Sequence, residues 1–154
     1  MSRLEERLTA MGITVPERVW NKGKNVAVNH VGDLLYVGGH GPTDSDGVMR
    51  LKGKLGRDLS VEQGYQAARN CAVVAFGNLK SYLGDLDRIV RVVRVLGFVN
   101  ATEEFQQHGA VIDGFSDVWI DLLGEQGRHA RSSIGVSSLA GGISVEIECT
   151  LQVR

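Results

Sequence analysis

The chain has 154 residues, of which 43% are hydrophobic and 23% are charged, and its formal net charge is −1. This size and mixture indicate one globular domain that can bury a core without a metal or a disulfide. A net charge near zero weighs against nucleic acid or an anionic membrane as a partner of the whole surface. No apolar run reaches the ~18 residues of a membrane span, and the charged N-terminus does not resemble a signal peptide. We therefore expect a cytoplasmic protein without a membrane partner.

Cysteine and histidine, which often carry chemistry, stand in positions that favour structural roles. Cys71 and Cys149 are far apart and lie among apolar residues, which favours buried free thiols in a reducing compartment over a disulfide. The four histidines show none of the spacings of a metal site, so no metal is expected. They are His30, His40, His108 and His129.

The N-terminal segment is predicted to begin with a short helix. Leu4, Leu8 and Met11 recur at helical spacing within a charged stretch, which indicates an amphipathic helix that ends at Gly12. Residues 13–25 contain one proline and a polar run, and they are predicted to form a linker.

A β-hairpin is expected next. Residues 26–31 and 34–37 are short apolar runs on either side of a Gly-Asp pair. The glycine-rich residues 38–42 are expected to stop the second strand as a tight turn, whose backbone N–H groups could contact a ligand. Residues 43–59 are expected to form a loop with at most one short strand.

A long helix is predicted after Ser60, because Ser60 and Gln63 have the spacing of a capping box. The helix is expected to end at Gly84-Asp85. Its apolar stripe consists of Tyr65, Ala68, Ala72, Phe76 and Leu79. Residues 88–99 carry arginines three apart, as a helix would, but their valines favour a largely buried strand, which we predict.

The C-terminal third is predicted to contain one helical region and a second hairpin. Residues 101–123 are expected to be helical with a break at Gly109 or Gly114. The hairpin strands are residues 130–136 and 143–153. Together the elements predict an α+β sandwich in which two helices pack on one face of a mixed sheet.

The last predicted strand offers a candidate catalytic group. Its apolar and polar residues alternate, so one face enters the core and the other carries Glu146 and Glu148 side by side. Two adjacent carboxylates cost stability unless solvent, a cation or a partner chain relieves their repulsion. They are either a solvated outer face or a site at which a carboxylate orients water.

Arg131 is the second candidate, and we expect it in a strand adjacent to the Glu146 strand. A planar guanidinium can bind a carboxylate through two hydrogen bonds. Arg131 could therefore form an internal ion pair with Glu146 or Glu148, or it could bind the carboxylate of a ligand.

Taken together, four motifs resemble the Rid (RidA/YjgF) family. They are Leu34–Pro42, Gly97–Asn100, Ala130–Ser133 and Val145–Glu148. Residues 83–86 and 127–132 resemble a branch of the family labelled RidA-like or endoribonuclease-like. The resemblance runs from about residue 25 to the C-terminus. It implies a single Rid-like domain, residues 25–154, preceded by a helical extension and linker, residues 1–24.

This resemblance implies a chorismate-mutase-like fold and a homotrimer with sites between subunits. It also implies a cofactor-free hydrolysis of imines and enamines that carry a carboxylate. In the family, the arginine at the position of Arg131 binds the substrate carboxylate, and the glutamate at the position of Glu146 orients the attacking water. The residues expected to line the pocket are Gly39, His40, Asp113, Gly114, Ser132 and Ser133.

Several positions depart from the family pattern. Ser133 stands where the family often has cysteine, His40 where it often has glutamine, and Asn25 where it commonly has an aromatic residue. Asp113-Gly114 falls near a family asparagine. These changes leave the carboxylate clamp in place but alter the rest of the pocket.

Two other functions remain open on the sequence. A trimer that binds keto or amino acids without turnover is one alternative, and the altered pocket favours it. An endoribonuclease or translation inhibitor is the other, although the net charge and the lack of an aromatic-basic surface weigh against it.

Overall fold

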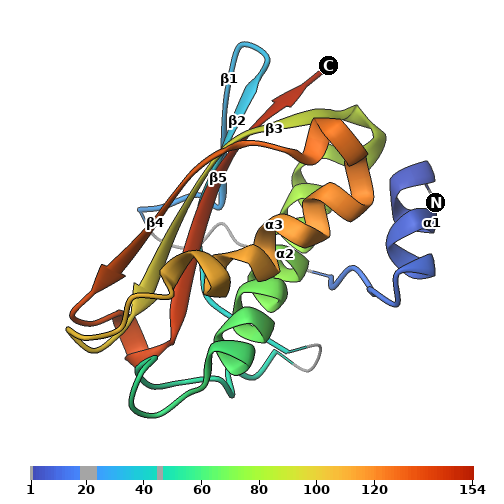
Figure 1. The fold of residues 1–154 in the computed structure, drawn as a ribbon. Helices are drawn as coiled ribbons and strands as arrows, with labels where there is room; N and C mark the ends of the chain where they lie inside the picture. The colour runs from blue at the N-terminus through green and yellow to red at the C-terminus, as the bar shows by residue number, and fades with distance from the viewer. Residues whose placement is uncertain (1, 18–23, 45–46) are drawn as a thin grey trace.

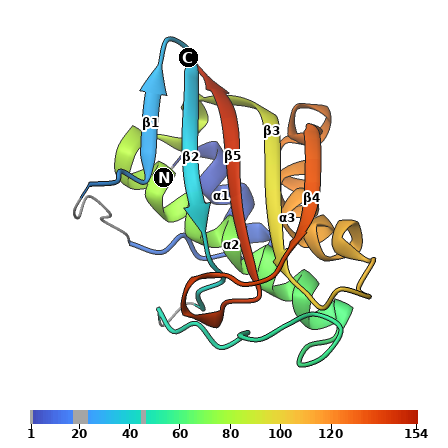
Figure 2. The same cartoon turned by 90° about the vertical axis from the view of Figure 1, so that its left-hand side faces the viewer.

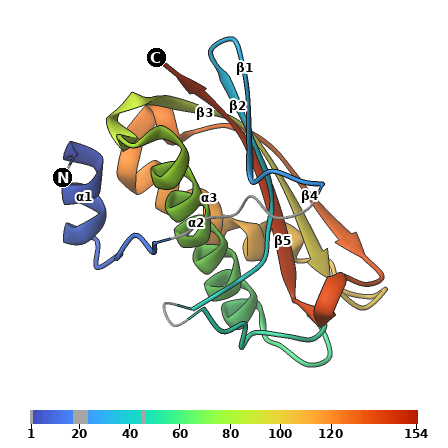
Figure 3. The same cartoon turned by 180° about the vertical axis from the view of Figure 1, so that it is seen from behind.

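The computed structural model describes residues 2–17, 24–44 and 47–154. Three helices lie on one side of a five-stranded sheet, and the other side of the sheet is open (Figures 1 and 3). The helices are α1 (Arg3–Ala10), α2 (Val61–Leu83) and α3 (His108–Leu123). The strands are β1 (Val28–Val31), β2 (Leu34–His40), β3 (Ile89–Asn100), β4 (Ala130–Val136) and β5 (Val145–Val153). The predicted α+β arrangement is confirmed.

The strands follow the order β1-β2-β5-β3-β4 across the sheet, as Figure 2 shows face on. All neighbours are antiparallel except β3 and β4, which are parallel and joined through α3. The predicted hairpin of the last two strands is therefore wrong, because β3 lies between β4 and β5. The expectation that the strand of Arg131 adjoins the strand of Glu146 fails for the same reason.

Helix α2 forms as its sequence predicts. The Ser60 hydroxyl accepts a hydrogen bond from the Gln63 backbone, and the Gln63 side chain accepts one from the Ser60 backbone. Gly84 ends the helix with a positive φ of 73°, which glycine adopts without steric cost. Four of the five stripe residues are buried, and they are Ala68, Ala72, Phe76 and Leu79.

Helix α3 begins only at His108, so the prediction of a helical region from residue 101 is wrong for residues 101–107, and the helix runs without the predicted break at Gly109 or Gly114. Instead, Gly114 lets α2 and α3 come close together. A Cβ at Gly114 would lie 2.0 Å from the carbonyl oxygen of Tyr65 in α2. The glycine that looked like a helix breaker in the sequence is therefore a packing residue, and we find its backbone in the interface between the two helices.

The core between the helices and the sheet is aromatic at its centre. Trp119 of α3 packs against Phe76 of α2, with 4.5 Å between their ring centroids. Cys71 and Cys149 are free and buried, as predicted. Burial raises the pKa of Cys71 well above its usual value and that of Cys149 to about 12, so both thiols stay protonated at neutral pH.

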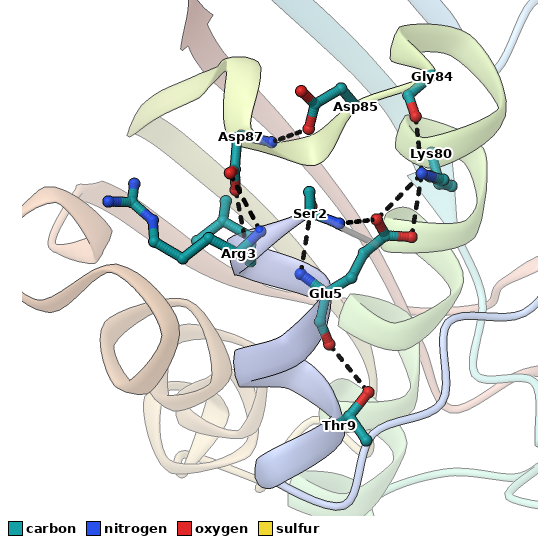
Figure 4. A network of polar contacts seen from close by, with 9 residues as sticks. Ser2, Arg3, Glu5, Thr9, Lys80, Gly84, Asp85 and Asp87 are labelled. Carbon is teal, nitrogen blue, oxygen red and sulfur yellow. Dashed lines mark hydrogen bonds and ion pairs between the residues drawn. The ribbon is translucent and has the colours of Figure 1, made fainter.

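The predicted N-terminal helix is confirmed as α1, and a polar network fixes its first turn (Figure 4). The carboxylate of Asp87 accepts hydrogen bonds from the backbone N–H groups of Arg3 at 3.1 Å and Leu4 at 2.8 Å. Glu5 forms an ion pair of 3.0 Å with Lys80 of α2. Residues 18–23 of the predicted linker lie outside the described residues.

Candidate functional site

Glu146 projects from the open face of the sheet, as the alternation in β5 predicts. Its neighbours Val145 and Ile147 are buried, whereas Glu146 is partly accessible and Glu148 is exposed. The carboxylate of Glu146 lies over Gly39 in the adjacent strand β2. A Cβ at Gly39 would lie 2.6 Å from Oε1 of Glu146, so the bare backbone at Gly39 makes room for this carboxylate.

Gly39 belongs to a bulge in β2 and not to the tight turn that the sequence suggested. Val37 pairs with Cys149 and His40 pairs with Ile147, so β2 has one residue more than β5 between these two pairs. The strand continues through His40 before it ends. This bulge brings the Gly39 backbone beside Glu146.

His40 turns its side chain into the core, away from the open face, and is only 1% exposed. Its Nδ1 donates a hydrogen bond to the carbonyl of Gly38, and its Nε2 accepts one from the Asn78 amide at 2.6 Å. Any contact of His40 with a ligand on the open face would therefore come from its backbone.

Arg131 of β4 projects towards α3, on the helix side of the sheet. Its Nη1 donates to the carboxylate of Asp113 at 2.8 Å and to the hydroxyl of Ser116 at 2.9 Å. Its Nη2 donates to the carbonyl of Gly109 at 3.4 Å. The internal ion pair of Arg131 is thus with Asp113 and not with Glu146 or Glu148.

A histidine continues this cluster. Nε2 of His129 lies 2.9 Å from the hydroxyl of Ser116, and Nδ1 lies 2.6 Å from the carbonyl of Gly127. Burial, and to a smaller degree the charge of Arg131, lower the pKa of His129 below its usual value of 6.5. His129 is therefore neutral at physiological pH. An open pocket of about 230 Å³ lies against this group of side chains.

The sequence did not single out Ser116 or His129 for this cluster. The signal was present, because Ser116 is three residues after Asp113 on the same helix face and His129 is two residues before Arg131 in extended chain. Only the packing of α3 on β4 shows that these pairs meet.

The remaining predicted pocket residues are spread over the structure. Ser132 is exposed beside Arg131, on the opposite face of the strand, because the side chains of a strand alternate. Ser133 has a buried hydroxyl with no hydrogen-bond partner among the described residues. Gly114 lies in the contact between α2 and α3. The structure thus joins Arg131 with Asp113 and Gly39 with Glu146, in two separate groups.

The two groups lie on opposite faces of the sheet. Val95 pairs with both Arg131 and Cys149 and points into the core, whereas Phe98 pairs with Glu146 on the open face. Strands β4 and β5 are separated by β3, a distance of about 10 Å. Within one chain Arg131 and Glu146 therefore cannot bind the same small molecule.

No group of three or more histidine, cysteine, aspartate or glutamate side chains among the described residues is arranged to hold a metal ion. No helix in residues 2–17, 24–44 and 47–154 is long and apolar enough to cross a membrane.

Known proteins resemble this chain over nearly its whole length. A family model described as "YjgF/chorismate mutase-like, putative endoribonuclease" matches residues 5–140. Protein TCP17 of Trypanosoma cruzi is 35% identical over 153 residues, which cover 99% of this chain and 95% of that protein.

Two solved structures have a similar fold. Atu1372 from Agrobacterium tumefaciens, a protein of unknown function, is 38% identical with a TM-score of 0.90, over 98% of this chain and 94% of that one. A protein of Shewanella oneidensis described as "a putative endoribonuclease" is 29% identical with a TM-score of 0.91, over 97% and 99% of the two chains. The likeness is therefore not confined to residues 25–154.

Proposed function

Because the chain belongs to the YjgF/chorismate-mutase-like family, we propose that it hydrolyses 2-imino acids and their enamine tautomers. The products are 2-keto acids and ammonia. A 2-imino acid is already electrophilic, so the protein needs only to hold its carboxylate and one water molecule in line. This requires one cation and one base, which Arg131 and Glu146 supply in this proposal.

The proposal is carried by the hydrogen bonding of the Arg131 guanidinium, which leaves two of its N–H groups available to a ligand. Three of its five N–H groups are taken by Asp113, Ser116 and Gly109. The Nε–H group and one Nη2–H group have no acceptor among the described residues. These two groups share one edge of the guanidinium, which can donate in parallel to both oxygens of a carboxylate. The side chain is 24% exposed, and it lines the open pocket of about 230 Å³, which a ligand can enter.

Glu146 acts as the base in the proposed reaction. The water oxygen forms a bond to the imine carbon while Glu146 takes a proton from the water and passes it to the imine nitrogen. Glu146 then takes the hydroxyl proton of the resulting carbinolamine and delivers it to the amine nitrogen. The carbon–nitrogen bond breaks, ammonia leaves, and the oxygen becomes the carbonyl of the keto acid.

A homotrimer with sites between subunits is part of this proposal. Since Arg131 and Glu146 lie on opposite faces of one sheet, a site that contains both needs two chains. The open sheet face also supports an assembly. Tyr36 and Ile134 on this face are 48% and 45% exposed, and a neighbouring chain could cover them while it relieves the repulsion between Glu146 and Glu148.

The proposal is tested by competition with a trapping reagent. An amino-acid oxidase generates a panel of imino acids, and semicarbazide captures those that the protein does not hydrolyse. Wild type should outcompete semicarbazide, and Arg131→Ala should lower kcat/KM about 100-fold, since a charged bidentate contact is lost. Arg57→Ala is the matched control, because Arg57 pairs with Asp58 at the surface. Failure of wild type on every imino acid would overturn the proposal.

A binding trimer without turnover is the second candidate. It is favoured by the Asp113 carboxylate, which already neutralises Arg131, and by the serine at position 133. This candidate predicts that keto or amino acids raise the melting temperature of a protein that releases no ammonia.

An endoribonuclease is the third candidate, and it is named in the description of the family. Cleavage of RNA that weakens steeply with salt would support it, because RNA binding releases counterions.

A further inference from the structure

Arg131 is held by a chain of hydrogen bonds whose direction is set by the backbone. The carbonyl of Gly127 can only accept, so Nδ1 of His129 carries the hydrogen and Nε2 is an acceptor. The hydroxyl of Ser116 must then donate to Nε2. This orientation turns a lone pair of the Ser116 oxygen to Arg131, whose Nη1 donates to it at 2.9 Å.

We infer that Ser116 and His129 are positioning residues that orient Arg131 for the carboxylate of its ligand. The inference rests on the proposed role of Arg131. With both Nη1 hydrogens assigned to Asp113 and Ser116, the guanidinium cannot rotate in its plane. The edge formed by Nε–H and Nη2–H therefore keeps one direction before a ligand arrives, which lowers the entropic cost of binding.

The hydrogen-bond partners of the Ser116 hydroxyl have no ready substitute for it. Ser116 is only 6% exposed, so solvent cannot easily supply the hydrogen bonds that it makes. Its replacement by alanine leaves Nε2 of His129 without a donor and one Nη1–H of Arg131 without an acceptor. Buried polar groups that lose their partners are costly, so Arg131 is expected to move to find new ones.

The neutral state of His129 is required for this arrangement. A protonated His129 would donate from both nitrogens, and the Ser116 hydroxyl could no longer donate to Nε2. The new charge would also lie next to Arg131 and near Arg128, whereas Asp113 and Asp117 of α3 would attract it. Glu125 pairs with Arg128, and Asp117 accepts a hydrogen bond from Tyr65. The carboxylates of Glu125 and Asp117 are therefore not free to balance the charge of a protonated His129 fully.

Two variants test the inference through the split between KM and kcat. Ser116→Ala should raise KM for the imino acid about 10-fold through the loss of a hydrogen bond to a charged group, with kcat within about threefold. His129→Gln should keep KM within about twofold at pH 7.5, because its amide oxygen can accept from Ser116. As the pH falls through the lowered pKa of His129, KM should rise in wild type but not in this variant.

The controls separate positioning from general destabilisation. Ser60→Ala removes a hydroxyl that caps α2 and forms no hydrogen bond with Arg131, so it should lower stability without changing KM. His30→Gln removes an exposed histidine and should leave the pH dependence of KM as in wild type. A KM that is the same in wild type and Ser116→Ala would overturn the inference.

A readout that needs no catalysis separates this inference from the proposed function. The Nε–H group of Arg131 gives an NMR signal, which is assigned by its absence in Arg131→Lys. An ordered signal in wild type that becomes mobile in Ser116→Ala supports the positioning role, even if no imino acid is hydrolysed. Imine hydrolysis by wild type with unchanged order in Ser116→Ala would leave the proposed function standing and reject the positioning role.

Discussion

Arg131 and Glu146 project from opposite faces of one sheet, on strands that β3 separates. An active site that contains both residues is then shared between chains, and two inactive variants should complement each other. In a trimer, each mixed assembly of Arg131→Ala and Glu146→Gln contains one site with both native residues. Random mixing at equal amounts should therefore restore about one quarter of the wild-type activity, provided that each site lies between neighbours.

The complementation is measured after the two variants are unfolded and refolded together, with each refolded alone as the control. Activity in the mixture and none in the separate samples is the expected result. A mixture as inactive as its components would place both residues of the site in one chain, against the geometry of the sheet.

The contact between Gly39 and Glu146 predicts a loss of activity without a loss of fold. In Gly39→Ala, the new Cβ would force the Glu146 carboxylate to move, since it would lie 2.6 Å from Oε1. A displaced base should lower kcat by up to about 100-fold. The free energy of unfolding should fall by less than about 1 kcal/mol, because only the end of a flexible side chain must shift.

Gly38→Ala is the matched control for this substitution. A Cβ at Gly38 would lie 3.7 Å from its nearest neighbours, the carbonyl oxygens of Val26 and Ala27. Equal losses of kcat in the two variants would show that the bulge matters as a whole and that the contact with Glu146 does not.

His129 should make the fold sensitive to mild acid. Its folded-state pKa lies below the unfolded value of 6.5, so between the two values the unfolded chain binds the proton more readily. The stability that neutral His129 contributes is complete above about pH 6.5 and is lost as the pH falls through the folded pKa. Chemical denaturation of wild type and His129→Gln between pH 7.5 and 5.5 should show a smaller loss in the variant. Identical pH profiles would contradict this assignment.

Asp87 should stabilise α1 more than the rest of the molecule. In Asp87, each carboxylate oxygen accepts a hydrogen bond from one backbone N–H group, of Arg3 or of Leu4. Asp87→Asn keeps only one of these two acceptor oxygens. A loss of about 1 kcal/mol is expected, as for other helix caps. Hydrogen exchange should quicken in α1 while β3 and β5 keep their protection. Asp33→Asn, at the tip of the first hairpin, is the control and should leave exchange in α1 unchanged.

Local patterns predicted the elements well, because each pattern reports an interaction within a few residues. The capping box of Ser60 and the alternation around Glu146 were read correctly for this reason. The neighbours of β4 were wrong because sequence proximity favours a hairpin, whereas the crossover through α3 inserts β3 between β4 and β5.

The candidate site was predicted only in part. Arg131 and Glu146 were singled out as candidates by their residue types, but whether their strands adjoin depends on sheet order, which the sequence did not reveal. Gly114 looked like a breaker because glycine is rare inside helices. Its role depends on the approach of Tyr65 from a helix about fifty residues earlier, and no local pattern records that contact.

The ion pair between Asp113 and Arg131 has a consequence for how strongly ionic strength affects binding. With the charge of the guanidinium already balanced by a carboxylate 2.8 Å away, the pair presents almost no net charge to an approaching anion. Selection of a carboxylate then depends mainly on the direction of two N–H groups of Arg131. It depends little on long-range electrostatic attraction, which is the part of binding that counterions screen. Affinity for a small acid should thus be nearly independent of salt, and bulk anions such as chloride should compete poorly for the same edge.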